Sequence, residues 1–288
     1  MTVIDPALRI GSVELAVSDL PRSIDFYERV LGLPVSSSDL DAARLGPEPQ
    51  RPALALSGIA RSTPVPPAST GLFHVAWLHP SRAALAATVR RVVGQRWPLE
   101  GASDHGVSEA LYLSDPDGLG IEIYVDRPRE QWERPADGRG VRMVTLPLDL
   151  EDLLAQDVGG AAPAMSPETT IGHVHLKVSD VPRASAFYGG ALGFEEQATL
   201  PSAAFFSAGG YHHHVGLNSW QSRGAGAAPD TAPGLRQVRF ELRDGDALDS
   251  LEQALGEEAS AARPARTDDG ELTVRDPDGQ LLAFGNPA

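Results

Sequence analysis

Hydrophobic and polar residues alternate in two short segments that lie far apart in the chain. In 173–178, Val174, Leu176 and Val178 form one face of an extended strand, and two histidines and a lysine form the other. In 13–17 the odd positions are strongly apolar. We therefore expect each segment to form a β-strand that is buried on at least one face.

Signals for a helix follow each of these strands. Ser-Asp and then a proline come next in both places, and proline is favoured in the first turn of a helix. Apolar residues then recur at helical spacing, and Gly32 and Gly193 suit the left-handed residue that ends many helices. We predict helices over 21–31 and 182–192.

Further strands and helices are expected in the same order in both halves of the chain. The pattern predicts additional helices at about 82–93 and 246–254, and additional strands at about 53–57, 71–78, 109–113, 120–125, 203–208, 235–242, 271–274 and 281–284. An Asp-Pro-Asp-Gly sequence, which is a hairpin signal, separates the last two strands of each half. Together these elements predict an α+β fold with mixed sheets and helices on one side.

The two halves are copies of one unit. The segment that begins at Ile10 returns at Ile171, which is 171 − 10 = 161 residues later, and the Asp-Pro-Asp-Gly turn returns with the same offset. A repeat of this length implies two copies of one fold unit. We divide the chain into a first domain over 1–130, a linker over 131–168 with a short helix near 148–156, and a second domain over 169–288.

Composition and charge exclude several classes of function. The 288 residues carry a net charge of −15, so no basic stripe is available to neutralise nucleic-acid phosphates or anionic membrane surfaces. The absence of cysteine excludes disulfides, thiolate metal sites and a cysteine nucleophile. The N-terminal residues lack a signal-peptide pattern and no apolar run is long enough to span a membrane, so we expect a cytoplasmic protein.

The copies differ at three positions that could hold a metal ion. The differing pairs are Ser12 and His173, Gln237 and His74, and Ala283 and Glu122. Two related copies offer two equivalent pockets, so one pocket would collect His74, Glu122 and His173 while the other has no metal-binding set. Two neutral imidazoles and one carboxylate leave coordination positions open, which suits non-haem Fe(II) that must bind substrate and O2 together.

Several motifs resemble the vicinal oxygen chelate superfamily, which includes glyoxalase I, bleomycin-resistance proteins and extradiol ring-cleaving dioxygenases. The resemblance begins with Gly-His-Val-His-Leu-x-Val-Ser-Asp at 172–180 and Phe-Tyr-x-x-x-Leu-Gly at 187–193. The segments 104–118, 120–124 and 209–218 narrow it to the catechol-2,3-dioxygenase-like (CatE-type) branch. The resemblance covers nearly the whole chain.

This resemblance implies two tandem glyoxalase-like domains, each built of paired βαβββ modules that form a curled mixed sheet around a metal cup. The ligand positions of the superfamily fall on His74, Glu122 and His173, the same residues that the comparison of the copies selects. The expected metal is Fe(II), with Mn(II) as an alternative that uses the same ligands. The ligands are divided between the halves, as in hydroquinone-cleaving relatives, which leaves open whether the substrate is a catechol or a hydroquinone.

The resemblance also implies residues around the metal. Tyr112 matches a tyrosine that bonds a substrate oxygen, and His105 matches a histidine at the pocket wall. His213 is the best match to the histidine that acts as acid and base, since an imidazole has a suitable pKa. Strand parity would place its neighbours in the triplet 212–214 on the opposite face, and the choice within the triplet stays open. The expected substrate contacts are His175 and His214.

The implied function is a non-haem Fe(II)-dependent extradiol dioxygenase that opens the ring of a small aromatic diol with O2. One alternative is a glyoxalase-like metal-dependent isomerase or lyase that consumes no O2. Another is a ligand-binding protein of the bleomycin-resistance type without catalysis. The sequence leaves open whether the chain forms a homo-oligomer.

Overall fold

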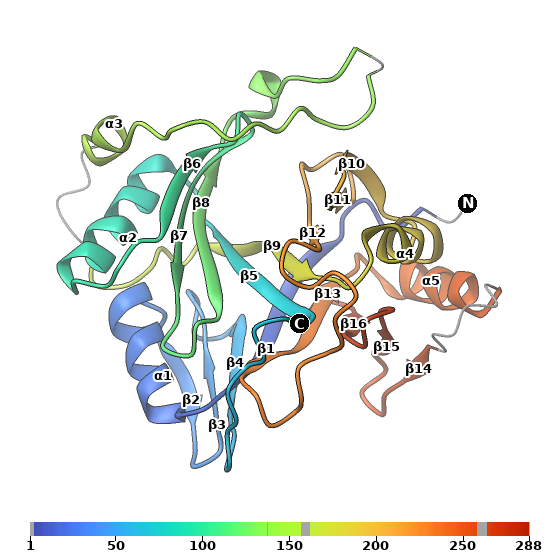
Figure 1. The fold of residues 1–288 in the computed structure, drawn as a ribbon, viewed down its shortest axis with the longest axis horizontal. Helices are drawn as coiled ribbons and strands as arrows, with labels where there is room; N and C mark the ends of the chain where they lie inside the picture. Colours follow the sequence, from blue (N-terminus) through green and yellow to red (C-terminus); the bar gives the residue numbers. More distant parts are fainter. Residues whose placement is uncertain (1–2, 137, 157–161, 258–263, 288) are drawn as a thin grey trace.

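The computed structural model describes residues 3–136, 138–156, 162–257 and 264–287 (Figure 1). The first copy contains β1 (Arg9–Val17), α1 (Leu20–Phe26), a π-helical turn (Tyr27–Leu31), β2 (Val35–Ser38), β3 (Ala42–Leu45), β4 (Leu54–Gly58), β5 (Gly71–Leu78), α2 (Arg82–Gly94), β6 (Gly101–Asp104), β7 (Ser108–Ser114) and β8 (Gly120–Asp126). It is therefore two βαβββ modules in succession, β1–β4 and β5–β8, as the resemblance implies.

The second copy repeats this order after the linker. A 3-10 turn (Arg129–Gln131) lies where the first domain meets the linker, and the linker carries α3 (Leu150–Leu154). The second copy contains β9 (Thr170–Lys177), α4 (Val181–Ser185), a π-helical turn (Ala186–Ala191), β10 (Glu195–Leu200), β11 (Ala203–Ser207), β12 (Val215–Asn218), β13 (Gly234–Glu241), α5 (Gly245–Glu257), β14 (Ala265–Arg266), β15 (Leu272–Arg275) and β16 (Leu281–Gly285). The short helix expected near 148–156 is thus present as α3.

Strands from different copies pair at the centre of the molecule. β5 of the first copy runs antiparallel to β9 of the second, and β1 of the first runs antiparallel to β13 of the second. β1 and β9 meet at one bridge, between Ile10 and Ile171, which joins the two halves of the sheet. We call β5–β8 with β9–β12 the first cup, and β1–β4 with β13–β16 the second cup. Each cup therefore takes one module from each copy.

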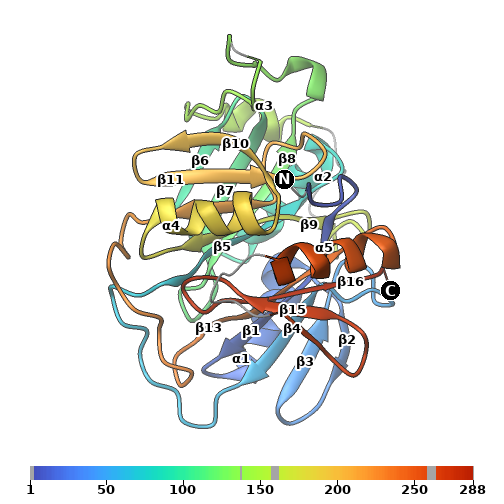
Figure 2. The same ribbon diagram turned by 90° about the vertical axis from the view of Figure 1, so that its right-hand side faces the viewer.

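The helices pack on the outside of the strands. In Figure 1, α1 and α2 lie on one side of the molecule, and α4 and α5 lie on the other. Figure 2 shows α4 and α5 in front of the strands that they cover. One continuous core of buried apolar side chains runs under these helices and includes Phe26, Trp77 and Phe240. No helix among the described residues is long and apolar enough to cross a membrane.

The predicted helix ends are confirmed in both copies. The side chain of Asp19 accepts a hydrogen bond from the backbone N–H of Arg22, and Asp180 caps α4 in the same way. Gly32 and Gly193 adopt left-handed φ angles of 77° and 76°. Each helix begins in the α form and finishes as a π-helical turn.

The Asp-Pro-Asp-Gly turns connect the two cups. Asp117, in the turn between β7 and β8, accepts hydrogen bonds from the backbone and hydroxyl of Ser18, which follows β1. The buried Tyr27 hydroxyl donates to Asp115 at 3.2 Å. The turn of the second copy repeats both contacts, with Ser179 on Asp278 and Tyr188 on Asp276. Each copy thus bridges the two cups by the same polar contacts.

Candidate metal centre

Three strands bring the predicted ligands to one point in the first cup. In the parallel pair β5–β8, Ala76 lies opposite Glu122, and in the antiparallel pair β5–β9, Ala76 lies opposite His173. His74 precedes Ala76 by two residues and therefore points to the same face. The small methyl group of Ala76 leaves space between the three longer side chains.

The donor atoms of these side chains lie close together. Nε2 of His74 is 3.0 Å from Oε2 of Glu122, Nε2 of His173 is 3.1 Å from the same oxygen, and the two nitrogens are 3.3 Å apart. All three side chains are buried. Donor atoms about 2.1 Å from a metal ion and at right angles around it lie about 3.0 Å apart. The residues therefore fit a facial two-histidine, one-carboxylate metal site.

The electrostatics of the group agree with metal binding. Burial alone would raise the pKa of Glu122, but His173 and His74 outweigh it and hold that pKa well below its ordinary value. Burial lowers the pKa of His173 to about 4. At neutral pH the group therefore presents an ionised carboxylate and an unprotonated imidazole at His173, which are the forms that coordinate metal ions.

Two glycines give the site its space. A Cβ at Gly172, immediately before His173, would lie 1.8 Å from the hydroxyl of Tyr124. A Cβ at Gly216 would lie 2.9 Å from the ring of His175. Both positions need glycine because buried aromatic rings pass close to the backbone. This explains the glycine that begins the Gly-His-Val-His motif.

Tyr112 and His105 form one wall of the site. Tyr112 lies opposite Glu122 in the β7–β8 pair, and its hydroxyl is 2.7 Å from Nε2 of His105. Nδ1 of His105 lies 2.7 Å from the carbonyl of Val144 in the linker and must donate to it. With Nδ1 as the donor, the lone pair on Nε2 of an unprotonated His105 would accept the Tyr112 proton and leave the Tyr112 oxygen free to accept a hydrogen bond. Burial and the nearby Glu122 raise the pKa of Tyr112.

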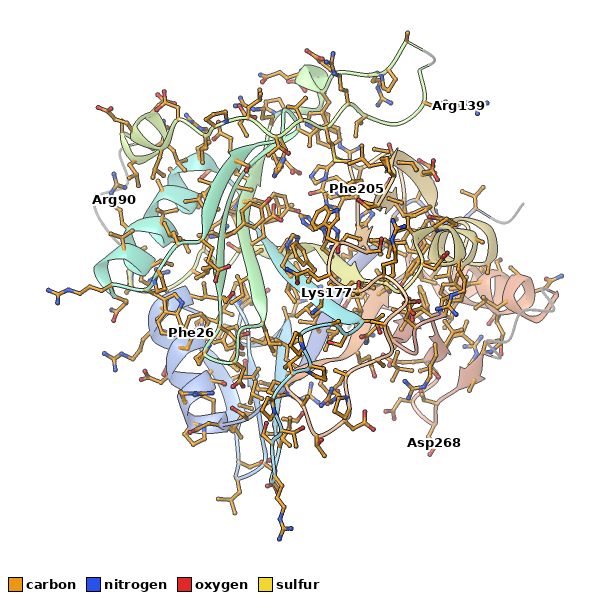
Figure 3. The ribbon with its side chains drawn as sticks, in the orientation of Figure 1. Phe26, Arg90, Arg139, Lys177, Phe205 and Asp268 are labelled. Atoms are coloured by element: carbon orange, nitrogen blue, oxygen red, sulfur yellow. The ribbon has the colours of Figure 1, made fainter. Side chains whose placement is uncertain are left out.

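His213 lies directly against the predicted ligands. Its ring centroid is 4.0 Å from that of His173. Phe205, which is labelled in Figure 3, packs on the His213 ring at 5.1 Å. Burial, together with His173 and the other neighbouring histidines, holds the pKa of His213 well below its ordinary value. The ring is therefore neutral at neutral pH.

The parity argument for the histidine triplet is wrong for His212. Residues 211–214 form a loop rather than a strand, since β12 begins at Val215. Nδ1 of His212 lies 2.8 Å from Nδ1 of His213, and Nε2 of His212 lies 2.9 Å from Oδ1 of Asp126. His212 therefore contacts the same cluster as His213. The sequence prediction had left the choice within the triplet open, and it did not name Asp126.

The two predicted substrate contacts have different surroundings. His175 packs against His74 at 5.1 Å and against the rings of Phe73 and Trp220, and its Nε2 has no hydrogen-bond partner among the described residues. His214 instead accepts a hydrogen bond from the backbone of Ala208, and its ring packs on Tyr211. The geometry places His175 beside the ligands and gives no such contact for His214.

The second cup lacks the three ligands at the matching positions. Arg239 pairs with Ser12 and with Ala283, just as Ala76 pairs with His173 and with Glu122 in the first cup. The side chain of Arg239 forms ion pairs with Glu241 and Glu271. Within the described parts of the chain, His74, Glu122 and His173 are the one group of His, Asp and Glu that could hold a metal ion.

Comparison with known families identifies the relatives of the chain. The model of the Glyoxalase/Bleomycin resistance protein/Dioxygenase superfamily matches residues 9–123 and 170–284. The chain belongs to this superfamily. The two matched regions confirm the predicted tandem glyoxalase-like fold.

One relative supports the narrower resemblance. Catechol-2,3-dioxygenase of Bacillus subtilis (strain 168) is 41% identical over 252 residues, which cover 86% of this chain and 88% of the relative. This likeness confirms the predicted place of the chain among catechol-2,3-dioxygenase-like proteins.

Solved structures share the fold at low sequence identity. A Bacillus subtilis subsp. subtilis str. 168 protein, provisionally described as a dioxygenase, matches with a TM-score of 0.68 at 13% identity, over 99% of this chain and 86% of its own. Glyoxalase I from Zea mays matches with a TM-score of 0.59 at 16% identity, over 97% of this chain and 92% of its own. At these identities the likeness concerns the fold alone.

Proposed function

We propose that this protein is a non-haem Fe(II)-dependent extradiol dioxygenase that opens the ring of a small aromatic diol with O2. The proposal rests on the three donor atoms of His74, Glu122 and His173, which lie 3.0–3.3 Å apart in a buried cup. The 41%-identical catechol-2,3-dioxygenase supports it. Mn(II) is the alternative metal, because it takes the same ligands.

The metal, when bound, would bring the diol and O2 together and let electron density pass from one to the other. His74, Glu122 and His173 would hold it and would leave the remaining coordination positions for the two substrates. The three side chains are themselves buried, so the metal would lie inside the cup rather than on the protein surface.

His213 and Tyr112 act on the substrate in this proposal, and His105 acts through Tyr112. Neutral His213 removes a proton from a hydroxyl group of the diol and returns it later in the reaction. Tyr112 accepts a hydrogen bond from a substrate hydroxyl, because its own proton is donated to His105. His105 therefore orients Tyr112 and is itself oriented by the linker carbonyl of Val144.

Aromatic side chains beside His175 form a surface for the substrate ring. Phe73 contacts His74, His175 and Trp220 at centroid distances of 5.2–5.3 Å. Trp220 is 52% exposed, so this surface reaches the outside of the protein. We place the ring of the diol against it, with the unpartnered Nε2 of His175 as a hydrogen-bonding contact. A substrate contact for His214 stays a prediction.

Oxygen consumption tests the proposal directly. Protein purified without air is loaded with Fe(II) or with Mn(II), mixed with a panel of catechols and hydroquinones, and then exposed to O2. We expect stoichiometric O2 uptake and the visible absorbance of a ring-opened product with at least one diol. The His173→Ala variant is the matched control and should show neither.

Two outcomes would overturn the proposal. The first is no O2 uptake with any diol by protein that carries one equivalent of metal. The second is turnover of an aldehyde adduct or similar substrate without O2, which would assign the chain to the glyoxalase-like isomerases. Tight binding of ligands without turnover would indicate a resistance-type binding protein.

We also propose the division into domains 1–130 and 169–288 with a linker over 131–168. Limited proteolysis should cut first within the linker if this division is right. The cytoplasmic location and the oligomeric state stay predictions, to be tested by cell fractionation and by light scattering.

A further inference from the structure

A chain of hydrogen bonds leads from the first cup to its edge and involves residues to which the proposed function gives no role. Oδ1 of Asp126 lies 2.9 Å from Nε2 of His212, and Nδ1 of His212 lies 2.8 Å from Nδ1 of His213. Asp126 ends β8, four residues after Glu122 on the same strand. Its side chain is 25% exposed, whereas that of His212 is fully buried.

The donors and acceptors of this chain can be assigned. An ionised carboxylate can only accept, so Nε2 of His212 carries the proton that binds Asp126. Neutral His212 then has a lone pair on Nδ1 and accepts from Nδ1–H of His213. Neutral His213 consequently has its lone pair on Nε2. This Nε2 atom has no hydrogen-bond partner among the described residues, and His213 keeps 8% of its surface exposed.

The ring of His212 is held firmly in this position. Tyr211 packs on it at a centroid distance of 4.1 Å, and Trp132 of the linker packs at 5.4 Å. The Tyr211 hydroxyl also donates to Oδ1 of Asp126 at 3.2 Å, and it shares a 2.7 Å hydrogen bond with Tyr124. A rotation of the His212 ring would break both of its hydrogen bonds.

We propose that Asp126 and His212 are positioning residues that fix the tautomer of His213, so that its basic Nε2 faces the reacting diol. This inference rests on the proposed function, because it assigns how the acid–base histidine of that reaction is held. Removing the carboxylate would let the His212 ring present Nδ1–H to His213. The lone pair of His213 would then lie on Nδ1, where it cannot take a proton from the substrate. In serine proteases, the buried aspartate has the same effect on the catalytic histidine.

Three variants separate this role from a purely structural one. Asp126→Asn keeps the shape of the side chain but can donate to His212 as well as accept. His212→Phe keeps the aromatic packing and removes both nitrogens. Tyr211→Phe is the matched control, because it removes the other hydrogen bond on Oδ1 of Asp126 and leaves the bond to His212.

Nitrogen NMR of histidine-labelled protein reads the tautomer without any turnover. The protein is loaded with Zn(II), which is diamagnetic, and the signals of His213 are assigned by their loss in His213→Gln. In the wild type and in Tyr211→Phe we expect Nδ1 of His213 to be protonated and Nε2 to be unprotonated. In Asp126→Asn we expect a detectable population of the opposite tautomer.

The kinetic expectation follows from the same change. In the Fe(II)-loaded enzyme, Asp126→Asn and His212→Phe should lower kcat by roughly 10- to 100-fold, with KM for the diol changed less than threefold and metal content unchanged. Tyr211→Phe should stay within threefold of the wild type in kcat.

The inference would be overturned if folded Asp126→Asn kept both the wild-type tautomer of His213 and the wild-type kcat. It would also be overturned if Tyr211→Phe and Asp126→Asn lost kcat to the same extent. If the wild type consumes no O2, the proposed function fails, and the NMR result still decides whether Asp126 sets the tautomer of His213.

Discussion

The two cups have the same strand pairing and different interiors. In the first cup, Ala76 sits between Glu122 and His173, and the three ligands converge in the space beside it. In the second cup, Arg239 occupies the position of Ala76 and its guanidinium pairs with Glu241 and Glu271. The backbone therefore permits a metal site in either cup, and the side chain at one central position decides whether there is room for it.

The largest expected effect comes from replacing a metal ligand of the first cup by alanine. The same replacement at the matching position of the second cup is the control. His74→Ala should lower metal affinity by about 100-fold or more and abolish O2 uptake, because two donors remain where three are needed. Gln237→Ala, at the matching position, should change neither. Metal analysis after dialysis, with oxygen-electrode assays, measures both. Full metal retention in His74→Ala would contradict the ligand assignment.

A second experiment tries to rebuild the lost site. The triple variant Ser12→His, Gln237→His, Ala283→Glu restores the ligand types, but Arg239 still fills the space, so we expect one metal per chain. Adding Arg239→Ala should raise the content toward two, since Glu241 keeps Arg9 and Arg51 as partners. Metal titration followed by calorimetry gives the number of sites. Two sites in the triple variant would show that Arg239 is not the obstacle.

Tyr112 also has a counterpart in the second cup, at a register-matched position. Thr273 lies opposite Ala283 just as Tyr112 lies opposite Glu122. Tyr112→Phe should lower kcat about tenfold, the effect of one hydrogen bond to the reacting diol. Thr273→Val should leave kcat unchanged. Steady-state kinetics with the best diol of the panel compares the two, and equal effects would remove Tyr112 from the site.

The smallest expected effect concerns the Asp-Pro-Asp-Gly turns, which have the same residues in both copies. Burial raises the pKa of Asp115 and of Asp276 to about 6 in the folded protein. Because the folded pKa exceeds the unfolded one, each carboxyl contributes stability that is full below about pH 4 and is lost as the pH rises through 6. The loss is at most about 3 kcal/mol per residue.

Asp115→Asn and Asp276→Asn should therefore each gain stability relative to the wild type when the pH rises from 4 to 7.5. Urea unfolding at both pH values measures this difference, which should be similar in the two variants because their surroundings match. A large gain in stability in one variant and none in the other would show that the two turns are not equivalent.

The sequence predicted most of the strands that bury an apolar face, although it missed β3, in which Ala43 and Leu45 are buried. It also missed strands that bury little apolar surface. β2 and β6 were not expected, because their residues, Val-Ser-Ser-Ser and Gly-Ala-Ser-Asp, are mostly polar and none of them is buried. Edge strands of this kind are held by backbone hydrogen bonds, which leave little trace in a hydrophobic pattern. β10 was missed for a related reason, since only Gln197 within it is buried.

The ligands could be predicted because the repeat supplied an internal reference. Ser12 against His173 is a chemical difference at a matched position, and no knowledge of the fold is needed to see it. His212 offered no such signal, because its role depends on a loop that turns it toward Asp126, 86 residues earlier in the chain. A parity rule that holds in a strand has no meaning in that loop.

Because the first cup takes one module from each copy, its three metal ligands are synthesised at different times. His74 and Glu122 lie in the first copy, and His173 follows His74 by 99 residues. At synthesis rates of about 5–20 residues per second, the third ligand follows the first by about 5–20 s. During that interval the growing chain holds at most two of the three donors and cannot form a facial site. The metal site can therefore form only after synthesis has entered the second copy and β9 has paired with β5.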